Sequence, residues 1–283
     1  MELVSIIIIT KNHSKYLSKC LKSVLDQNYK NIEIILVDHN SSDNTSEIVK
    51  SFNSDKIKYF LYKENKGIAN VRNFGIRNSK GKLIFFTDSD CIVTKNWIEE
   101  GITIFSNDNV EGIEGKTIAE NQNFGASEHF VENFLGGQYQ TCNIAYKRST
   151  LIEIGMFNEN YRIAYEDVEL ALRVKKKYTI KFNPEMLVFH QLVKWSIKAL
   201  ICNAFRGGDK VMLVKEHKYK QILNFGILEI NSLIVIFFPF LLFFYYRIKS
   251  LRDLIIIPIF FLRAIIHRLV IWKAAYNNKI LIF

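Results

Sequence analysis

Two carboxylates, Asp88 and Asp90, are separated by one small residue, Ser89, directly after a short apolar run. The run Leu83–Phe86 has the length of a buried strand, and the Lys80-Gly81 pair before it is typical of a loop. Open α/β sheets bind their ligands at the carboxyl ends of their strands. Because carboxylates this close repel each other unless a cation or donors share their charge, the pair suits a divalent metal that carries a phosphate. An isolated Asp-x-Asp is also a common helix-capping turn, so the surrounding sequence decides between these two interpretations.

Apolar runs alternate with amphipathic segments around this pair. The runs predict buried strands at residues 4–9, 32–37, 57–62 and 83–87. The segments between them predict helices at residues 14–25, from 44 onward and at 67–78. Asn44 and Glu47 have the spacing of a capping box at the start of the second helix. Strands and helices that alternate at this spacing predict a parallel α/β sheet with right-handed crossovers.

Two common nucleotide-binding classes are excluded by the turns that follow the predicted strands. The turn after the first strand, residues 10–13, contains no glycine, so the Gly-x-Gly-x-x-Gly dinucleotide fingerprint is absent. The phosphate-binding Gly-x-x-x-x-Gly-Lys-Ser/Thr loop is absent as well. The sequence therefore argues against an NAD enzyme and against a P-loop ATPase.

Five segments occur in an order and spacing that resembles family 2 of the glycosyltransferases, which are inverting enzymes of the GT-A fold. The segments are Val4–Asn12, Val37–Thr45, Asn65–Gly75, Thr87–Asp90 and Gly155–Arg173. The resemblance extends over about residues 3 to 210. It implies a mixed, mainly parallel sheet flanked by helices, a nucleotide-diphosphate sugar donor that is usually a UDP-sugar, and a Mn²⁺ or Mg²⁺ ion.

The resemblance also assigns residues to the nucleoside part of the donor. It implies that Asp38 accepts a hydrogen bond from the nucleobase, and that Thr10 and Asn12 belong to a turn that packs on the base. Ile9 and Lys11 depart from the family pattern, which often has proline and an aromatic residue at these positions. Because of these two departures, the resemblance does not decide whether this turn stacks on the base.

The remaining donor and metal residues follow from the same resemblance. It implies that Arg72 forks onto phosphate or base oxygens, and that Asp88, with Ser89 beside it, holds the ribose or a metal-bound water. Asp90 is expected to coordinate the metal. His190, after a predicted strand at residues 186–189, either completes the metal site or is a core histidine. The other five histidines, which include residue 13, lie in no comparable context.

A second acidic pair, Glu166 and Asp167, begins a predicted helix. Acidic residues are favoured at a helix start by the helix dipole, so the pair alone is ambiguous. It follows a segment that matches the family's acceptor region, Thr141–Arg148. Inverting sugar transfer needs one carboxylate that takes the proton of the acceptor hydroxyl. Asp167 is the expected general base, although the sequence does not separate it from Glu166.

The excess positive charge lies in the last third of the chain. Residues 191–283 carry 14 lysine and arginine residues against 4 aspartate and glutamate residues, so their net charge of +10 equals that of the whole chain. In the same region, residues 192–220 predict a basic helical stretch that is interrupted at Gly207-Gly208. The apolar segments Phe225–Tyr246 and Leu254–Trp272 follow it. This combination favours an anionic membrane surface as partner. A module of basic residues interleaved with aromatics is not evident, so no nucleic-acid partner is expected.

We therefore expect a GT-A domain at residues 1–220 and a hydrophobic, basic, membrane-associated helical region at 221–283. The first apolar segment has the length of a membrane span, whereas charged residues within the second favour a helix that lies in the interface. Four widely spaced cysteines fit reduced thiols, and the run at residues 4–9 is too short for a signal peptide. The expected location is the cytoplasmic face of the cell membrane.

The sequence thus predicts a metal-dependent inverting glycosyltransferase that acts on a hydroxyl of a lipid-linked or cell-surface glycan. A nucleotidyltransferase that makes nucleotide sugars is disfavoured because Thr10–Lys15 contains no glycine for a phosphate loop. A catalytically degenerate GT-A domain that acts as a membrane-bound partner of an active transferase is the remaining alternative. Lys11 supports that alternative, whereas the intact pairs Asp88/Asp90 and Glu166/Asp167 oppose it.

Overall fold

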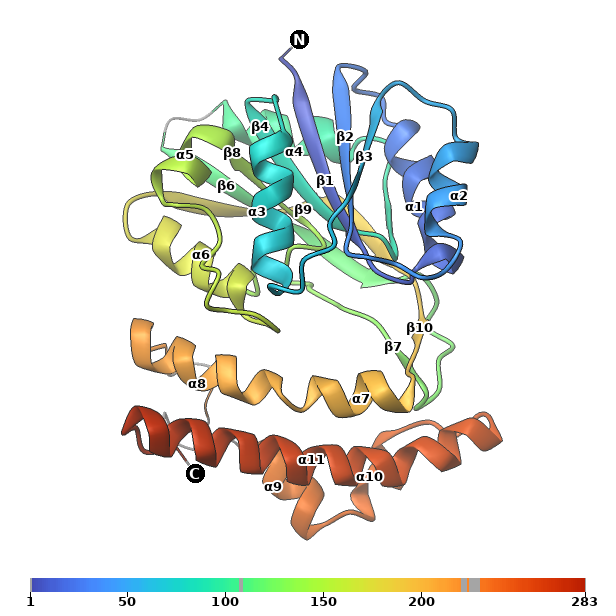
Figure 1. The fold of residues 1–283 in the computed structure, drawn as a ribbon, viewed down its shortest axis with the longest axis vertical. Helices are drawn as coiled ribbons and strands as arrows, with labels where there is room; N and C mark the ends of the chain where they lie inside the picture. Colours follow the sequence, from blue (N-terminus) through green and yellow to red (C-terminus); the bar gives the residue numbers. More distant parts are fainter. Residues whose placement is uncertain (1, 107–108, 220–222, 224–229, 283) are drawn as a thin grey trace. The chain divides into compact units, whose positions relative to one another are not determined.

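A computed structural model describes residues 2–106, 109–219, 223 and 230–282 (Figure 1). The chain divides into two compact units. The first unit consists of Met1–Glu120, Phe130–Arg162 and Glu166–Gln191. The second unit consists of Asn121–His129, Ile163–Tyr165 and Leu192–Phe283. The boundary expected between residues 220 and 221 lies outside the described residues.

The first unit is built on an eight-stranded sheet with the order β3-β2-β1-β4-β8-β6-β9-β5. Its strands are β1 (Val4–Thr10), β2 (Ile32–Asp38), β3 (Ile57–Leu61), β4 (Leu83–Asp88), β5 (Cys91–Val93), β6 (Val110–Ala119), β8 (Ile144–Lys147) and β9 (Thr179–His190). Strands β1 to β4 pair in parallel, whereas β8 runs antiparallel to both β4 and β6. The predicted mixed, mainly parallel sheet is therefore confirmed.

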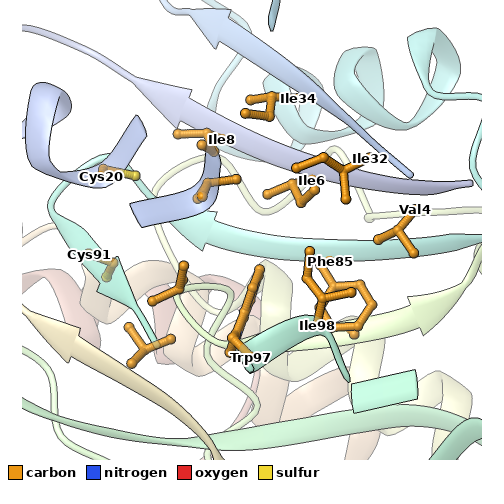
Figure 2. Close-up of a cluster of buried hydrophobic side chains, with 14 of the residues drawn as sticks. Val4, Ile6, Ile8, Cys20, Ile32, Ile34, Phe85, Cys91, Trp97 and Ile98 are labelled. Carbon is orange, nitrogen blue, oxygen red and sulfur yellow. The ribbon is translucent and has the colours of Figure 1, made fainter. Parts of the chain in front are cut away.

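Helices cover both faces of this sheet (Figure 1). The core on one face includes residues of α1 (Ser14–Leu25), α2 (Thr45–Ser51) and α4 (Trp97–Phe105). The core on the other face includes residues of α3 (Ile68–Asn78), α5 (Arg148–Glu153) and α6 (Glu166–Lys175). Alternate residues of β1 enter opposite cores. Ile6 and Ile8 lie in the first core (Figure 2). Ile7 lies in the second core. Burial on both faces explains why the sequence of β1 is apolar on both sides of the strand.

The starts of α1 and α2 are both capped by the carboxylate of Asp43. The capping box expected from Asn44 and Glu47 is wrong, because the side chain of Asn44 makes no capping hydrogen bond. Asp43 instead accepts hydrogen bonds from the backbone N–H of Ser14 at 2.9 Å and of Thr45 at 3.2 Å. Burial raises the pKa of Asp43, but hydrogen bonds from Thr45 and Ser14 outweigh this effect and lower it.

The second unit contains a two-stranded sheet and five helices within the part of the chain that is described. Its elements are β7 (Glu128–His129), β10 (Val193–Lys194), α7 (Ile197–Asn203), α8 (Arg206–His217), α9 (Ile230–Phe237), α10 (Leu241–Tyr245) and α11 (Leu251–Asn278). The interruption expected at Gly207-Gly208 is wrong, since both glycines lie inside α8 and the helices break at residues 204–205. A Cβ atom on Gly207 would lie 2.8 Å from Ile271 Cγ1, so this glycine allows α8 to approach α11 closely.

The two apolar segments form different structures. Residues 225–229 of the first segment lie outside the described residues, and the remainder forms two short helices, α9 and α10, that are separated near Pro239. Among the described helices, α11 alone has the length and composition to cross a membrane, with a mean hydropathy of 2.3 over its best 18-residue window. Within the described residues, the candidate span is therefore α11, which contains the second segment.

Candidate active site

The first acidic pair lies at the carboxyl end of β4. Asp88 is the last residue of β4, and Asp90 directly precedes β5. His190 ends β9 and is paired in register with Cys91 of β5. This pairing brings His190 Nε2 to 3.7 Å from Asp90 Oδ1, and both side chains are almost fully buried. Sheet pairing therefore joins a carboxylate and an imidazole that are far apart in the sequence.

Hydrogen bonding determines the tautomer of His190. Its Nδ1 lies 2.8 Å from the carbonyl oxygen of Gln191. Because a carbonyl oxygen only accepts, Nδ1 must carry the proton, and in the neutral ring Nε2 then presents its lone pair toward Asp90. Metal-ligating histidines are usually oriented by such a bond from the second ring nitrogen. The arrangement fits a divalent cation held between Asp90 and His190.

Cys91 lies close enough to share this site. One potential ligand atom from each of Asp90, Cys91 and His190 lies within 4.8 Å of the others. Burial raises the pKa of the Cys91 thiol. Thiolates suit softer metals, whereas carboxylates suit Mg²⁺ and Mn²⁺, so Asp90 with His190 beside it is the better match to these ions.

His13 is a residue that the sequence interpretation missed. Its Nδ1 lies 3.7 Å from Asp90 Oδ2 and 3.0 Å from Ser89 Oγ. His13 belongs to the turn after β1, and β1 pairs with β4, whose end precedes Ser89. Neighbouring parallel strands place their following turns at the same sheet edge, so the rule that singled out Asp88 could also have found His13.

The pKa of Asp88 reflects its burial and the charges of its two neighbours, Arg72 and Asp90. Burial raises the pKa of Asp88, the nearby Arg72 opposes this shift, and the Asp90 carboxylate adds to it. The guanidinium of Arg72 lies 3.8 Å from Asp88 Oδ1. A second positive charge on the Asp90 side, such as a metal ion, would relieve the repulsion between the carboxylates.

Arg72 joins the two acidic motifs. Its Nη1 donates a hydrogen bond to Glu166 Oε1, and both side chains are buried. Arg72 therefore lies between Asp88 and Glu166 rather than facing solvent, and its predicted contact with the donor stays a prediction. The guanidinium also lies 5.8 Å from the centre of the Phe157 ring, so an aromatic face covers it.

Asn73, the next residue of α3, fixes the loop that leads to the second motif. Its amide nitrogen donates to the carbonyl of Phe157 at 2.9 Å, and its oxygen accepts from the Phe157 N–H at 2.9 Å. At the start of the same helix, a Cβ on Gly67 would lie 2.8 Å from the backbone of Arg162. Gly67 also has φ of 97°, so its glycine identity permits both the backbone conformation and the close approach.

Glu166 and Asp167 occupy different environments at the start of α6. Glu166 is buried against Arg72, whereas Asp167 is half-buried. Asp167 Oδ1 accepts a hydrogen bond from the Val168 N–H at 2.8 Å. The two adjacent carboxylates thus differ in access, with Asp167 the more open one.

Asp38 ends β2, and both of its oxygens accept hydrogen bonds from the protein. Tyr59 Oη donates to Oδ2 at 2.7 Å, and the Ser41 N–H donates to Oδ1 at 2.8 Å. In the register of the sheet, Asp38 pairs with Thr10 and the neighbouring Ile9 pairs with Asp88. Two strand spacings therefore separate the ends of β2 and β4, which is about 10 Å.

The turn that contains Thr10 and Asn12 is tied to the turn after β2. Thr10 is buried, and Asn12 adopts the left-handed conformation with φ of 55°. The Asn12 N–H donates to Ser41 Oγ at 2.8 Å, and its side-chain oxygen accepts from the Ser42 N–H at 2.7 Å. These bonds organise the edge beside Asp38, and nucleobase contact by Thr10 and Asn12 stays a prediction.

Comparison with known sequences identifies relatives of this chain. The model of Glycosyl transferase family 2 matches residues 5–166. The chain is 27% identical over 202 residues to the glycosyltransferase AglE of Haloferax volcanii, covering 66% of each protein. It is 30% identical over 245 residues to an uncharacterized glycosyltransferase of Rickettsia bellii, covering 82% of this chain and 32% of that protein. The matches thus span about two thirds and about one third of these relatives' lengths.

Solved structures with a similar fold extend over most of the chain. The mannosyltransferase PcManGT from Pyrobaculum calidifontis, in complex with GDP-Man and Mn²⁺, gives a TM-score of 0.61 at 16% identity and covers 96% of this chain and 73% of that one. The S. aureus TarS 1-349 structure in complex with UDP-GlcNAc also gives 0.61, at 15% identity, covering 99% and 93%. These similarities show the GT-A fold.

Proposed function

Since the chain belongs to glycosyl transferase family 2, we propose that it is a metal-dependent inverting glycosyltransferase that uses a nucleotide-diphosphate donor of the UDP-sugar class. The observation that carries this proposal is the convergence of two acidic motifs on Arg72. One guanidinium contacts Asp88 beside the candidate metal ligands and Glu166 beside the candidate base. Donor and acceptor chemistry require such groups within one site.

We assign the donor to the carboxyl edge of β1, β2 and β4. Asp38, with Thr10 and Asn12 nearby, would contact the nucleobase, and Asp88 with Ser89 would hold the ribose or a bound water. The basic side chain of Arg72 would offset negative charge on the diphosphate.

Asp90 and His190 are the residues that would hold Mn²⁺ or Mg²⁺. When bound there, the ion would stabilise the negative charge of the departing diphosphate. The fixed tautomer of His190, with Nδ1 donating to a backbone carbonyl, supports this assignment because it directs Nε2 toward Asp90.

We assign the general base to Asp167 rather than to Glu166. Glu166 is buried and engaged by Arg72, whereas Asp167 is more accessible. Its carboxylate would take the proton of the acceptor hydroxyl while that oxygen bonds to the anomeric carbon. The bond from that carbon to the diphosphate oxygen would break on the opposite face, so the configuration inverts. In this assignment Glu166 positions the start of α6 through Arg72.

We further propose that the second unit attaches the enzyme to the cytoplasmic face of the cell membrane and that the acceptor is a lipid-linked or cell-surface glycan. Large aromatic side chains near α9 and α10 are highly exposed, with Phe237 at 70%, Phe244 at 84% and Tyr245 at 80%. Basic residues follow them at Arg247 and Lys249. Aromatic side chains with adjacent basic groups are typical of segments that lie in a membrane interface.

Contacts of α11 support an interfacial rather than a spanning helix. Arg263 Nε donates to Asn203 Oδ1 at 3.1 Å, and His267 Nδ1 donates to the carbonyl of Ala204 at 2.8 Å. The polar residues of α11 thus contact α7 and the α7–α8 connection within the second unit. A helix that used these contacts would have one polar face against protein and another face available to lipid.

The decisive experiment measures nucleoside diphosphate release from a panel of UDP-, GDP- and dTDP-sugars, with and without EDTA. We expect one nucleotide class to be used, EDTA to abolish turnover and Mn²⁺ to restore it. Asp90→Asn should weaken this metal response, whereas the exposed carboxylate variant Glu185→Gln should not. Turnover that ignores chelation would refute metal dependence. Donor binding without any turnover would favour the degenerate partner domain instead.

A further inference from the structure

The second unit contains a cavity of about 660 Å³ whose lining combines basic and apolar side chains. Four basic side chains line it, namely Arg206, Lys210, Arg263 and His267. Among the described residues that line it, none is an aspartate or a glutamate. The cavity therefore offers a concentrated positive charge that complements an anion.

Apolar and aromatic side chains also line the cavity. They include Val235, Phe238, Leu242 and Phe260. The rings of Tyr246 and Phe260, which both line it, stack at 4.5 Å with an interplanar angle of 6° and form a flat aromatic surface. Such a surface suits a hydrocarbon chain, because burying apolar surface is favourable.

One residue that lines the cavity precedes the candidate catalytic pair directly. This residue is Tyr165. The guanidinium of Arg206 lies 5.9 Å from the centre of the Tyr165 ring. The backbone of Tyr165 has φ of 64°, in the left-handed region. Asp209 of α8 holds this segment by accepting hydrogen bonds from the N–H groups of Ile163 and Ala164, each at 2.9 Å. The next two residues in the chain are Glu166 and Asp167.

We propose that this cavity binds the phosphate and adjoining hydrocarbon of a lipid-linked acceptor. Guanidinium and ammonium groups recognise phosphate oxygens by charge-assisted hydrogen bonds, and the apolar and aromatic lining residues would contact the hydrocarbon. A bulk membrane phospholipid offers the same chemistry, but the connection through Tyr165 favours the acceptor, whose reacting hydroxyl must reach Asp167. The inference rests on the proposed function, because it specifies the acceptor of that reaction.

The test uses the full chain in nanodiscs of zwitterionic phosphatidylcholine, with hexadecyl phosphate as the probe. Isothermal titration calorimetry should detect binding of hexadecyl phosphate. Hexadecanol lacks the phosphate and inorganic phosphate lacks the hydrocarbon, so each should bind at least about tenfold more weakly. Equal binding of hexadecanol would overturn the proposed phosphate site. Displacement of the probe by phosphatidylglycerol vesicles at equal phosphate concentration would overturn the acceptor assignment in favour of a membrane phospholipid.

Substitutions connect the binding to this cavity. Arg263→Gln should weaken hexadecyl phosphate binding about tenfold or more, because hydrogen bonds to charged groups are the strong ones. Arg206→Gln changes an exposed side chain and provides the same test if Arg263→Gln fails to fold. The matched control is Lys273→Gln, an exposed basic residue of α11 that does not line the cavity. An equal loss in Lys273→Gln would overturn the site.

Two further measurements separate this inference from the proposed function. If the wild-type protein binds hexadecyl phosphate but turns over no nucleotide sugar, the cavity assignment stands as a lipid-phosphate site and the transferase proposal fails. If it transfers sugar to a soluble acceptor and hexadecyl phosphate neither binds nor inhibits, the cavity assignment is overturned while the transferase proposal stands.

Discussion

Arg72 of α3 donates a hydrogen bond to Glu166 at the start of α6, across 94 positions of the chain. Only 5% and 4% of their side-chain surfaces are exposed. The same guanidinium lies 3.8 Å from Asp88 Oδ1, so a single cation relates the end of β4 to the helix that carries Asp167. The pair therefore fixes the second acidic motif relative to the first.

Removing the cation from this pair should destabilise the protein strongly. Arg72→Gln leaves the Glu166 carboxylate buried without that partner, which should lower the free energy of unfolding by about 3 kcal/mol. Glu166→Gln should also be destabilising, and the double variant should lose less than the sum of the two single losses. Urea unfolding of the four proteins measures this coupling.

Arg77→Gln is the control for that cycle, because Arg77 lies on the same helix and forms a half-exposed contact with Glu159 at 3.9 Å. This variant should lower the free energy of unfolding by less than about 1 kcal/mol. Additive effects of Arg72→Gln and Glu166→Gln would show that the two side chains do not stabilise the protein as a pair.

Asp167→Asn should lower kcat by about 10² to 10⁴-fold while it leaves the affinity for UDP unchanged, because an amide cannot take the acceptor proton. Initial rates of sugar transfer and equilibrium UDP binding measure the two quantities separately. Glu185→Gln, an exposed acidic side chain on β9, is the control and should retain full activity. Nearly full turnover in Asp167→Asn would remove this residue from the base assignment.

The arrangement of β1 to β4 could be predicted from the sequence because apolar runs alternate with polar turns. In β2 all seven residues are buried, and only Glu33 interrupts the apolar run that ends at Asp38. The strand β3 is partly exposed, and its apolar residues still marked it as a strand. The position of Asp88 follows from the same pattern, since it directly ends such a run. Local composition was therefore sufficient for these elements and for the carboxylates at their ends.

The partners within the site could not be predicted in this way. The approach of His190 to Asp90 depends on the antiparallel pairing of β9 with β5, which joins residues far apart in sequence. The contact of Arg72 with Glu166 likewise depends on how α3 and α6 pack on one face of the sheet. Contacts between residues far apart in the sequence leave no local pattern. The sequence around Arg72 therefore does not show whether this arginine faces solvent or is buried.

The helix break predicted at Gly207-Gly208 lies at residues 204–205 instead, because a glycine can either interrupt a helix or allow close helix packing. Gly207 and Gly208 predict an interruption by their helix propensity, yet both lie inside α8. Gly207 is accommodated because the side chain of Ile271 packs where its Cβ would be. Tertiary packing against α11 therefore overrides the local preference.

Metal affinity should depend on His190. His190→Gln should weaken Mn²⁺ binding by about tenfold or more, since it removes the imidazole nitrogen 3.7 Å from Asp90 Oδ1. Electron paramagnetic resonance of free Mn²⁺ measures binding without any turnover. His129→Gln, in the second unit, is the control and should bind Mn²⁺ like the wild type. Unchanged affinity in His190→Gln would leave this histidine as a core residue.

The start of α11 should show an acid-dependent stability that originates at Asp253. This carboxylate accepts hydrogen bonds from the N–H groups of Ser127 at 2.7 Å and of Lys249 and Ser250, each at 2.9 Å, and it completes a capping box with Ser250. Burial alone would raise the pKa of Asp253, but the hydrogen bonds from Ser127, Lys249 and Ser250 outweigh it and lower the pKa below its ordinary value.

Because the folded-state pKa is depressed, the contribution of Asp253 to stability is complete above the unfolded-state pKa of about 3.9 and decreases as the pH falls below it. Asp253→Asn should therefore cost about 1 to 2 kcal/mol at pH 6, and this difference from the wild type should shrink below about pH 4. Urea unfolding in a non-ionic detergent from pH 3 to pH 7 measures it, with Asp55→Asn, an exposed carboxylate, as control. A difference that stays constant down to pH 3 would show that the lost stability comes from packing at this helix start rather than from the ionised carboxylate.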